Sequence, residues 1–221
     1  YLTKNIDKTM EYAKRLLEHP FSDKLKTKTY IAKILISSGK EQEGLEMLNE
    51  LSEKNNENIE VKKLLIDTYI NKNNFIAAIE LYKQIVDLVN PLEVKSVHTE
   101  MSNVFAKWAR YLFEKRELNE CFKTFTIAIQ YDNANPEIYY ELGLVNYEIK
   151  NFNEAIIQLK KAISINANEP KYYMAIADCY QSIGNTFEQK DSLLAAINVD
   201  ENNTTAYFKL AMLYDGQHDK A

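Results

Sequence analysis

Apolar residues recur along most of the chain with the three- to four-residue spacing of amphipathic helices, in paired segments separated by short polar breaks. The stretches 136–169 and 170–203 each contain an apolar-periodic segment, a break containing Gly or Asn, and a second apolar-periodic segment. They align without a gap at a period of 34 residues. The pattern predicts a helix, a turn and a second helix in each stretch.

The same register extends toward the N-terminus and continues past residue 203. It predicts five full repeats, a half repeat before them and a truncated repeat after them: 25–58, 59–92, 102–135, 136–169 and 170–203, with 1–24 and 204–221 at the two ends. We expect all of these to form one solenoid over residues 1–221, because a helical hairpin buries its apolar faces only against neighbouring hairpins.

An insertion, residues 93–101, interrupts this register just after Asn90 and Pro91. Pro is tolerated in the first turn of a helix, and Asn is a common cap just before it. We therefore expect the insertion to lengthen the first helix of the next repeat, to about 92–115. Such a helix would extend past its neighbours and could mark a bend in the stack, although a tolerated extension without a role is an equally open interpretation.

Aligned repeats share the size of the residue at each core position. A first-helix column holds a small residue in five of six repeats: Ala32, Ile66, Ala109, Gly143, Ala177 and Ala211. One second-helix column is mostly small: Gly44, Ala78, Cys121, Ala155 and Gln189. Another second-helix column is large and apolar: Leu48, Tyr82, Phe125, Leu159 and Leu193. Two helices pack closely only where a small residue lies at their crossing. The columns therefore predict an all-α fold with a continuous core.

These columns resemble the tetratricopeptide repeat (TPR), whose signature is a large residue, Leu-Gly and, in the second helix, two Ala positions. The best matches are Tyr139, Leu142, Gly143, Ala155 and Ala162. The resemblance covers nearly the whole chain, although Asn146 and Gln189 replace the Tyr and Ala that the family favours. It implies a right-handed α-solenoid that binds another protein and is not an enzyme.

The resemblance also implies that a peptide or helix of the partner lies in a concave groove formed by the first helices. By register, a basic stretch and then an aromatic and Met-containing stretch face this groove: Lys33, Lys63, Lys107, Arg110, Tyr140, Leu144, Tyr147, Met174 and Phe208. Arg and Tyr are enriched where binding energy concentrates, and Met adapts to varied partners. One hypothesis is a ligand with an acidic part and an apolar part. The alternative is that the basic residues are solvated and the aromatic residues cover neighbouring repeats.

Some TPR domains grip a carboxylate at the C-terminus of a chaperone with Lys, Asn and Arg side chains. At the corresponding positions only Lys107 and Arg110 fit, so we do not expect this clamp here.

Composition and charge argue against several other functions. The net charge of −5 disfavours a nucleic-acid partner, and no run of Lys and Arg offsets it. Cys121 and Cys179 match no metal or redox spacing and are expected to be buried, while His19, His98 and His218 fall in different repeats. We expect no metal, no cofactor and no catalytic site. No apolar run is long enough to span a bilayer.

The chain begins at Tyr1 and stops within a repeat, so we expect it to be part of a longer protein of open localisation, with the cytoplasm favoured for this fragment. One alternative function is assembly of a membrane-associated complex. The layout, including the lengthened middle helix, resembles the TPR region of bacterial lipopolysaccharide-assembly proteins, whose anchor and paired CxxC motifs this chain lacks. Another alternative is a homo-oligomer that forms through the terminal repeats.

Overall fold

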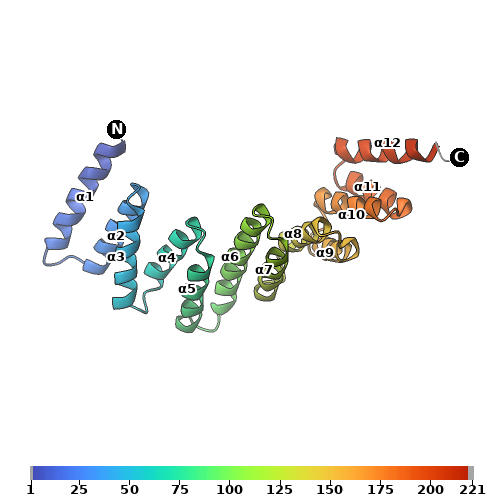
Figure 1. Ribbon diagram of the computed structural model, residues 1–221. Helices are drawn as coiled ribbons and strands as arrows, with labels where there is room; N and C mark the ends of the chain where they lie inside the picture. The colour runs from blue at the N-terminus through green and yellow to red at the C-terminus, as the bar shows by residue number, and fades with distance from the viewer. Residues whose placement is uncertain (1, 219–221) are drawn as a thin grey trace. The chain divides into compact units, whose positions relative to one another are not determined.

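The computed structural model describes residues 2–218, and in this range all the regular secondary structure is α-helical (Figure 1). The helices of this range run in chain order: α1 (Leu2–Glu18), α2 (Lys24–Ser37), α3 (Glu41–Lys54), α4 (Ile59–Asn71), α5 (Phe75–Leu88), α6 (Val94–Glu114), α7 (Leu118–Tyr131), α8 (Pro136–Glu148), α9 (Phe152–Ile165), α10 (Pro170–Ser182), α11 (Thr186–Val199) and α12 (Thr204–His218). The all-α fold of paired helices predicted from the sequence is confirmed.

By its contacts the chain divides into two compact units, Tyr1–Val97 (unit 1) and His98–Ala221 (unit 2). In unit 1 each helix from α1 to α5 packs against the next, and in unit 2 the same holds from α7 to α12. Within unit 2, α6 is joined to α7 by a buried hydrogen bond of 2.8 Å from Ser102 Oγ to the Ala128 carbonyl. The single solenoid over the whole chain stays a prediction.

The turn between the two helices of a repeat is the same in all five complete hairpins. Each has one residue with positive φ at the same repeat position, and in only two hairpins is that residue a glycine: Gly39, Asn73, Arg116, Lys150 and Gly184. The next residue donates its N–H to a carbonyl five residues earlier, as Asn151 does to Asn146 at 2.8 Å. This is the hydrogen bond that closes helix C-termini in the left-handed cap.

Helix α6 spans Val94–Glu114, where the sequence predicts a helix of about 92–115. It begins later because the Asn90 side chain accepts a hydrogen bond from the Leu92 N–H at 3.0 Å and its carbonyl accepts from Glu93, which makes a turn of Pro91–Glu93. The added helical turns are packed. Val97 and Met101 are buried, and within unit 2 the His98 ring meets the Tyr131 ring edge-on at 5.3 Å.

The predicted core columns are buried in the five complete hairpins. The crossing of α8 and α9 is so close that a Cβ on Gly143 would lie 2.7 Å from Leu159 Cγ, which explains the small residue there. The sixth row of the alignment differs, because Ala211 is exposed although it falls in a core column. No second helix packs on α12 within the described residues, so this position has nothing to be buried against.

Candidate functional site

A cavity of about 570 Å³ opens on unit 2 along first helices α8 and α10 and the start of α12. Its apolar wall includes Tyr140, Leu144, Tyr147 and Met174, and side chains from α10 and α12 form much of its polar wall: Lys171, Asp178, Thr205 and Lys209. Because these side chains come from successive first helices, stacking of the repeats is what creates the cavity.

A second, smaller cavity of about 270 Å³ lies beside it, between α6, α7 and α8. Four apolar side chains and three charged ones line it: Phe113, Phe125, Leu144, Val145, Arg110, Glu114 and Glu141. Leu144 lines both cavities, so the two lie next to each other along α8.

The aromatic wall of the larger cavity is held by the core beneath it. Tyr140, Leu144 and Tyr147 are half-buried and pack against the buried cluster that α9 and α10 share. The Tyr140 ring lies 5.2 Å from the Tyr172 ring, and Ser182 Oγ donates a hydrogen bond of 3.3 Å to the Tyr147 hydroxyl. The same side chains therefore cover a neighbouring repeat and line the cavity, so the two interpretations of these aromatic residues are compatible.

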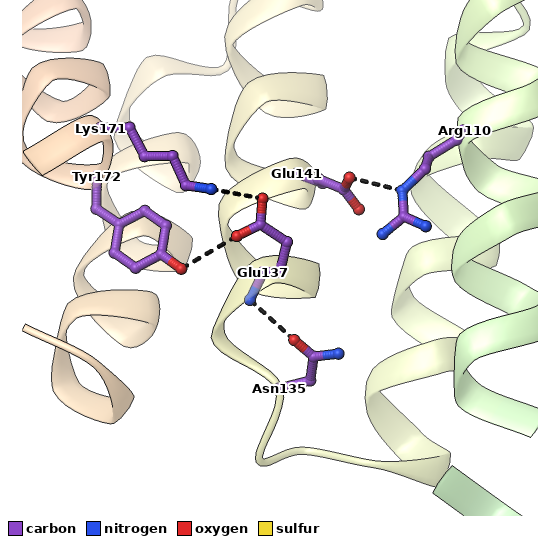
Figure 2. A network of polar contacts seen from close by, with 6 residues as sticks. All are labelled: Arg110, Asn135, Glu137, Glu141, Lys171 and Tyr172. Carbon is purple, nitrogen blue, oxygen red and sulfur yellow. Dashed lines mark hydrogen bonds and ion pairs between the residues drawn. The ribbon is translucent and has the colours of Figure 1, made fainter. Parts of the chain in front are cut away.

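Two glutamates one turn apart on α8 link it to both neighbouring first helices (Figure 2). Glu137 accepts from Lys171 Nζ at 2.8 Å and from the Tyr172 hydroxyl at 3.2 Å, both on α10. Glu141 accepts from Arg110 Nε on α6 at 2.6 Å. Asn135 caps the helix by accepting the Glu137 N–H at 3.0 Å. These contacts connect α8 with the first helix on each side of it, and Arg110, Glu141 and Lys171 also line the cavities.

The cations around the larger cavity are paired within the protein. The hydrogen bond to Glu137 raises the pKa of Lys171, whose ammonium also lies 5.0 Å from the centre of the Tyr140 ring. Burial raises the pKa of Tyr140, so its hydroxyl is neutral at physiological pH. Lys209 forms an ion pair with Asp178. The cavity therefore presents neutral aromatic surface flanked by ion pairs.

Of the nine residues that the sequence predicts for a groove, five line these cavities: Arg110, Tyr140, Leu144, Tyr147 and Met174. Lys107 and Phe208 are exposed in unit 2 but line neither cavity, and Lys33 and Lys63 belong to unit 1. Lys33 pairs with Glu60 at 3.3 Å. A ligand-binding role for any of the nine stays a prediction.

The sequence analysis did not predict the ion pairs beside the larger cavity. The sequence contains a signal for one of these ion pairs, because Glu137 and Lys171 occupy the same repeat position 34 residues apart and carry opposite charges. Equivalent positions on adjacent first helices lie side by side, so opposite charges there predict an ion pair between repeats.

The described residues around the cavities provide neither an exposed thiol nor a metal-binding cluster. Cys121 and Cys179 are fully buried, and burial, with a smaller effect of nearby Glu141 and Asp178, raises each thiol pKa to about 12. Among the described residues no group of three or more His, Cys, Asp or Glu is placed to hold a metal ion. Nor does any described helix have the length and apolarity needed to cross a membrane.

Both cavities thus lie on a stack of helical hairpins, which defines the chain as an α-helical repeat protein. Residues 136–169 and 170–203 match the model of the tetratricopeptide repeat family. These two stretches are tetratricopeptide repeats, and the chain has the fold of proteins of that family.

Solved structures with this fold share little sequence with the chain. YrrB, described as a TPR protein with an unusual peptide-binding site, is 13% identical, with 92% of this chain and 96% of that chain covered and a TM-score of 0.54. The first TPR of Spaghetti (RPAP3), bound to an HSP90 peptide, is 17% identical over 54% of this chain and 95% of that chain, with a TM-score of 0.52. The Yersinia enterocolitica secretion chaperone SycD, in complex with a YopD peptide, is 15% identical over 53% of this chain and 95% of that chain, with a TM-score of 0.51. No curated protein matches the chain in sequence.

Proposed function

We propose that the chain is a protein-interaction scaffold and that unit 2 binds an extended segment of a partner protein in the larger cavity. One observation supports this above all others. Tyr140, Leu144 and Met174, from two successive first helices, form a continuous apolar wall that is half-buried rather than fully buried. Pockets of this volume with mostly apolar walls and a few polar groups are typical of ligand sites.

The wall is already ordered by the core, which favours binding. Tyr140 and Tyr147 are fixed by their contacts with Tyr172 and Ser182, so little side-chain entropy remains to be lost when a ligand docks. Tyrosines in such a setting are the residues on which binding energy concentrates.

The fold neighbours support the same function by analogy. RPAP3 and SycD are seen with peptides of other proteins, and YrrB is described as having a peptide-binding site. The proposal transfers to this chain only the use of the fold to hold a peptide.

The ion pairs favour an apolar segment over an acidic one. Arg110, Lys171 and Lys209 already pair with Glu141, Glu137 and Asp178. An acidic ligand would have to displace a carboxylate that the protein itself supplies, which cancels most of the gain. We therefore place the apolar part of the ligand in the larger cavity and do not require an acidic part.

The pairing also determines which variants test the proposal cleanly. Arg110→Ala would leave the Glu141 carboxylate without its ion-pair partner, so a loss of binding could report local misfolding. Met174→Ala with Tyr147→Ala removes cavity wall without breaking an ion pair. The matched control is Ile157→Ala with Phe187→Ala, two apolar side chains that are 58% and 70% exposed on second helices α9 and α11.

The test is selection of a displayed library of random peptides, each about twelve residues long, on the folded chain. The selected peptides are then titrated against the wild type and both double variants by fluorescence polarisation. We expect at least roughly tenfold weaker binding to the Met174/Tyr147 variant, with unchanged binding to the control. If no peptide is enriched, or if the two variants weaken binding equally, the proposal is wrong.

Self-association is a second candidate, which one observation favours. Phe208 and Met212 on α12 are 65% and 61% exposed, one turn apart on an apolar helix face. We expect Phe208→Ser with Met212→Ser to abolish any concentration-dependent rise in mass measured by light scattering. A constant monomer mass of the wild type at high concentration would reject this candidate.

A further inference from the structure

Glu141, one of the residues that line the smaller cavity of unit 2, has a buried carboxylate oxygen that lacks a hydrogen-bond donor. Glu141 Oε1 accepts from Arg110 Nε at 2.6 Å, but Oε2 is buried and no donor among the described residues reaches it. Figure 2 shows the arrangement, with Arg110 joined to one oxygen of Glu141 only. The Glu141 side chain as a whole is 20% exposed, so it borders the cavity and is not sealed in the core.

An oxygen in this state is costly for the free protein. A buried carboxylate oxygen without a donor loses its hydration and gains nothing in return. Because Oε2 is closed to water-sized molecules, a donor reaches it only when the carboxylate turns toward the cavity. A ligand that brings a donor to the turned carboxylate recovers that loss, so the cavity favours ligands with a donor at this point.

The charges around the cavity indicate which donor fits. One cation and two anions line it, namely Arg110 against Glu114 and Glu141, which leaves a net negative charge. Phe113, Phe125, Leu144 and Val145 make the remaining wall apolar. A group that matches both features has an aliphatic stem and a positively charged tip, which is the character of a lysine side chain.

We propose that the smaller cavity takes a lysine side chain of the bound segment, with its aliphatic stem against Phe113 and Leu144 and its ammonium donating to Glu141 Oε2. This inference rests on the proposed function. Because Leu144 is a wall of both cavities, a segment whose apolar residue occupies the larger cavity can place a nearby lysine in the smaller one. The partner segment is therefore apolar and basic.

The test uses the peptides selected from the library above. Those enriched on the wild-type chain should share a lysine at a fixed distance from an apolar residue. Replacing that lysine by norleucine keeps the aliphatic stem and removes the ammonium, and it should weaken binding at least roughly tenfold. Glu141→Gln replaces a carboxylate oxygen by an amide nitrogen, which cannot accept, so on this variant the lysine and norleucine peptides should bind equally.

A matched control separates this carboxylate from another in unit 2. Glu120 on α7 lines neither cavity and pairs with Lys123 at 2.7 Å, so Glu120→Gln removes a paired carboxylate outside the proposed binding surface and should keep the preference for lysine. Circular dichroism verifies that each variant is folded. If Glu141→Gln does not fold, the norleucine substitution on the wild type, read from the carbon-13 methyl shifts of Leu144 and Val145, decides instead.

The outcomes distinguish the two proposals. Peptides that depend on Met174 and Tyr147 but bind equally with lysine and norleucine would overturn the lysine site and leave the proposed function intact. Enrichment of tyrosine or another neutral donor in place of lysine would also overturn it. An absence of any selected peptide would overturn both.

Discussion

Helices α4 in unit 1 and α8 in unit 2 are first helices of equivalent repeats and have the same length, yet they present different surfaces. At two of the positions that the register places toward a groove, α4 has Lys63 and Asp67 where α8 has Tyr140 and Leu144. The core positions between them agree, because Leu65 and its equivalent in α8 are both buried. The positions that build a repeat and the positions that face outward therefore vary independently.

The difference shows where function can be specialised in such a chain. Packing columns are constrained in every repeat by contact with both neighbours, whereas outward positions are constrained only by what binds there. The apolar cavity is a property of α8, α10 and α12, and the fold alone does not create it at every repeat. Four sets of substitutions test how far this separation extends, from the largest expected effect to the smallest.

The largest effect tests the equivalence of the two cores. Leu48 and Leu159 occupy the same second-helix column in units 1 and 2, and both are fully buried. Each Leu→Ala change should lower the free energy of unfolding by about 3 kcal/mol. Urea denaturation followed by circular dichroism measures this. A difference between the two of more than about 1.5 kcal/mol would show that the columns are not equivalent, because the usual spread at matched sites is of that order.

The second prediction concerns a substitution that reproduces on α10 the two charged residues of α4. Met174→Lys makes α10 read Lys and Asp at the positions where α4 has Lys63 and Asp67. The ammonium would lie in the apolar wall of the cavity, so peptide affinity should fall roughly tenfold. Stability should change by less than about 1 kcal/mol, because the site is only half-buried. Fluorescence polarisation and a thermal melt give the two values, and unchanged affinity would mean that the wall does not bind the peptide.

The third prediction concerns a column in which the two units differ inside the core. Lys62 is fully buried where α8 has Tyr139, and its ammonium donates to Asn56 Oδ1 at 2.9 Å and Gln84 Oε1 at 2.5 Å. Burial lowers the pKa of Lys62. Lys62→Met removes a buried charge while Asn56 and Gln84 remain exposed to water, so we expect a gain of about 1 kcal/mol at neutral pH.

The pH dependence of that gain has a definite sign. The pKa of Lys62 is lower in the folded chain, so above that pKa the folded chain binds fewer protons than the unfolded chain. In that pH range the stability of the wild type therefore rises with pH relative to that of Lys62→Met. The advantage of the variant is therefore full below the lowered pKa and shrinks as pH rises through it. Thermal melts of both proteins from about pH 7 to about pH 10 measure this. A constant gap would contradict it.

The smallest effect tests the hairpin turn. Lys150 has a φ of 63° at a position where Gly184 fills the same role in the next repeat. Lys150→Gly should relieve the left-handed strain but increase the freedom of the unfolded chain, for a net gain of about 0.5 kcal/mol. The matched change Gly184→Lys should cost a similar amount. Differential scanning calorimetry resolves both, and a loss on Lys150→Gly would indicate that the side chain makes a stabilising contact.

The sequence was sufficient for the fold because its contacts repeat. Every 34 residues the same column meets the same neighbours, so the small residue at Gly143 and the large one at Leu159 are predictable from the alignment. The partners of the charged side chains were harder to predict from the sequence. Arg110 is part of the predicted basic stretch, but its actual partner, Glu141, depends on which side-chain rotamers reach across two helices.

The exposure of Ala211 agrees with the truncated last repeat that the sequence predicts, because no second helix packs on α12 among the described residues. One further feature could not be read from the pattern. The orphan oxygen of Glu141 depends on atomic geometry, because an acidic residue at an outward position is expected to be solvated. The periodic residue types therefore predict the packing of the helices. The chemistry of the site depends on interatomic distances, which the pattern does not contain.

The shared geometry of the hairpin turn has a consequence for how such a chain tolerates changes in length. All five turns occupy three residues: 38–40, 72–74, 115–117, 149–151 and 183–185. One added residue there would move the left-handed position away from its hydrogen bond and rotate the second helix out of its column. The junction between repeats is less restricted, because the insertion 93–101 is absorbed there as extra turns at the start of α6. Insertions and domain fusions engineered into this protein should therefore be placed before first helices and never within a hairpin.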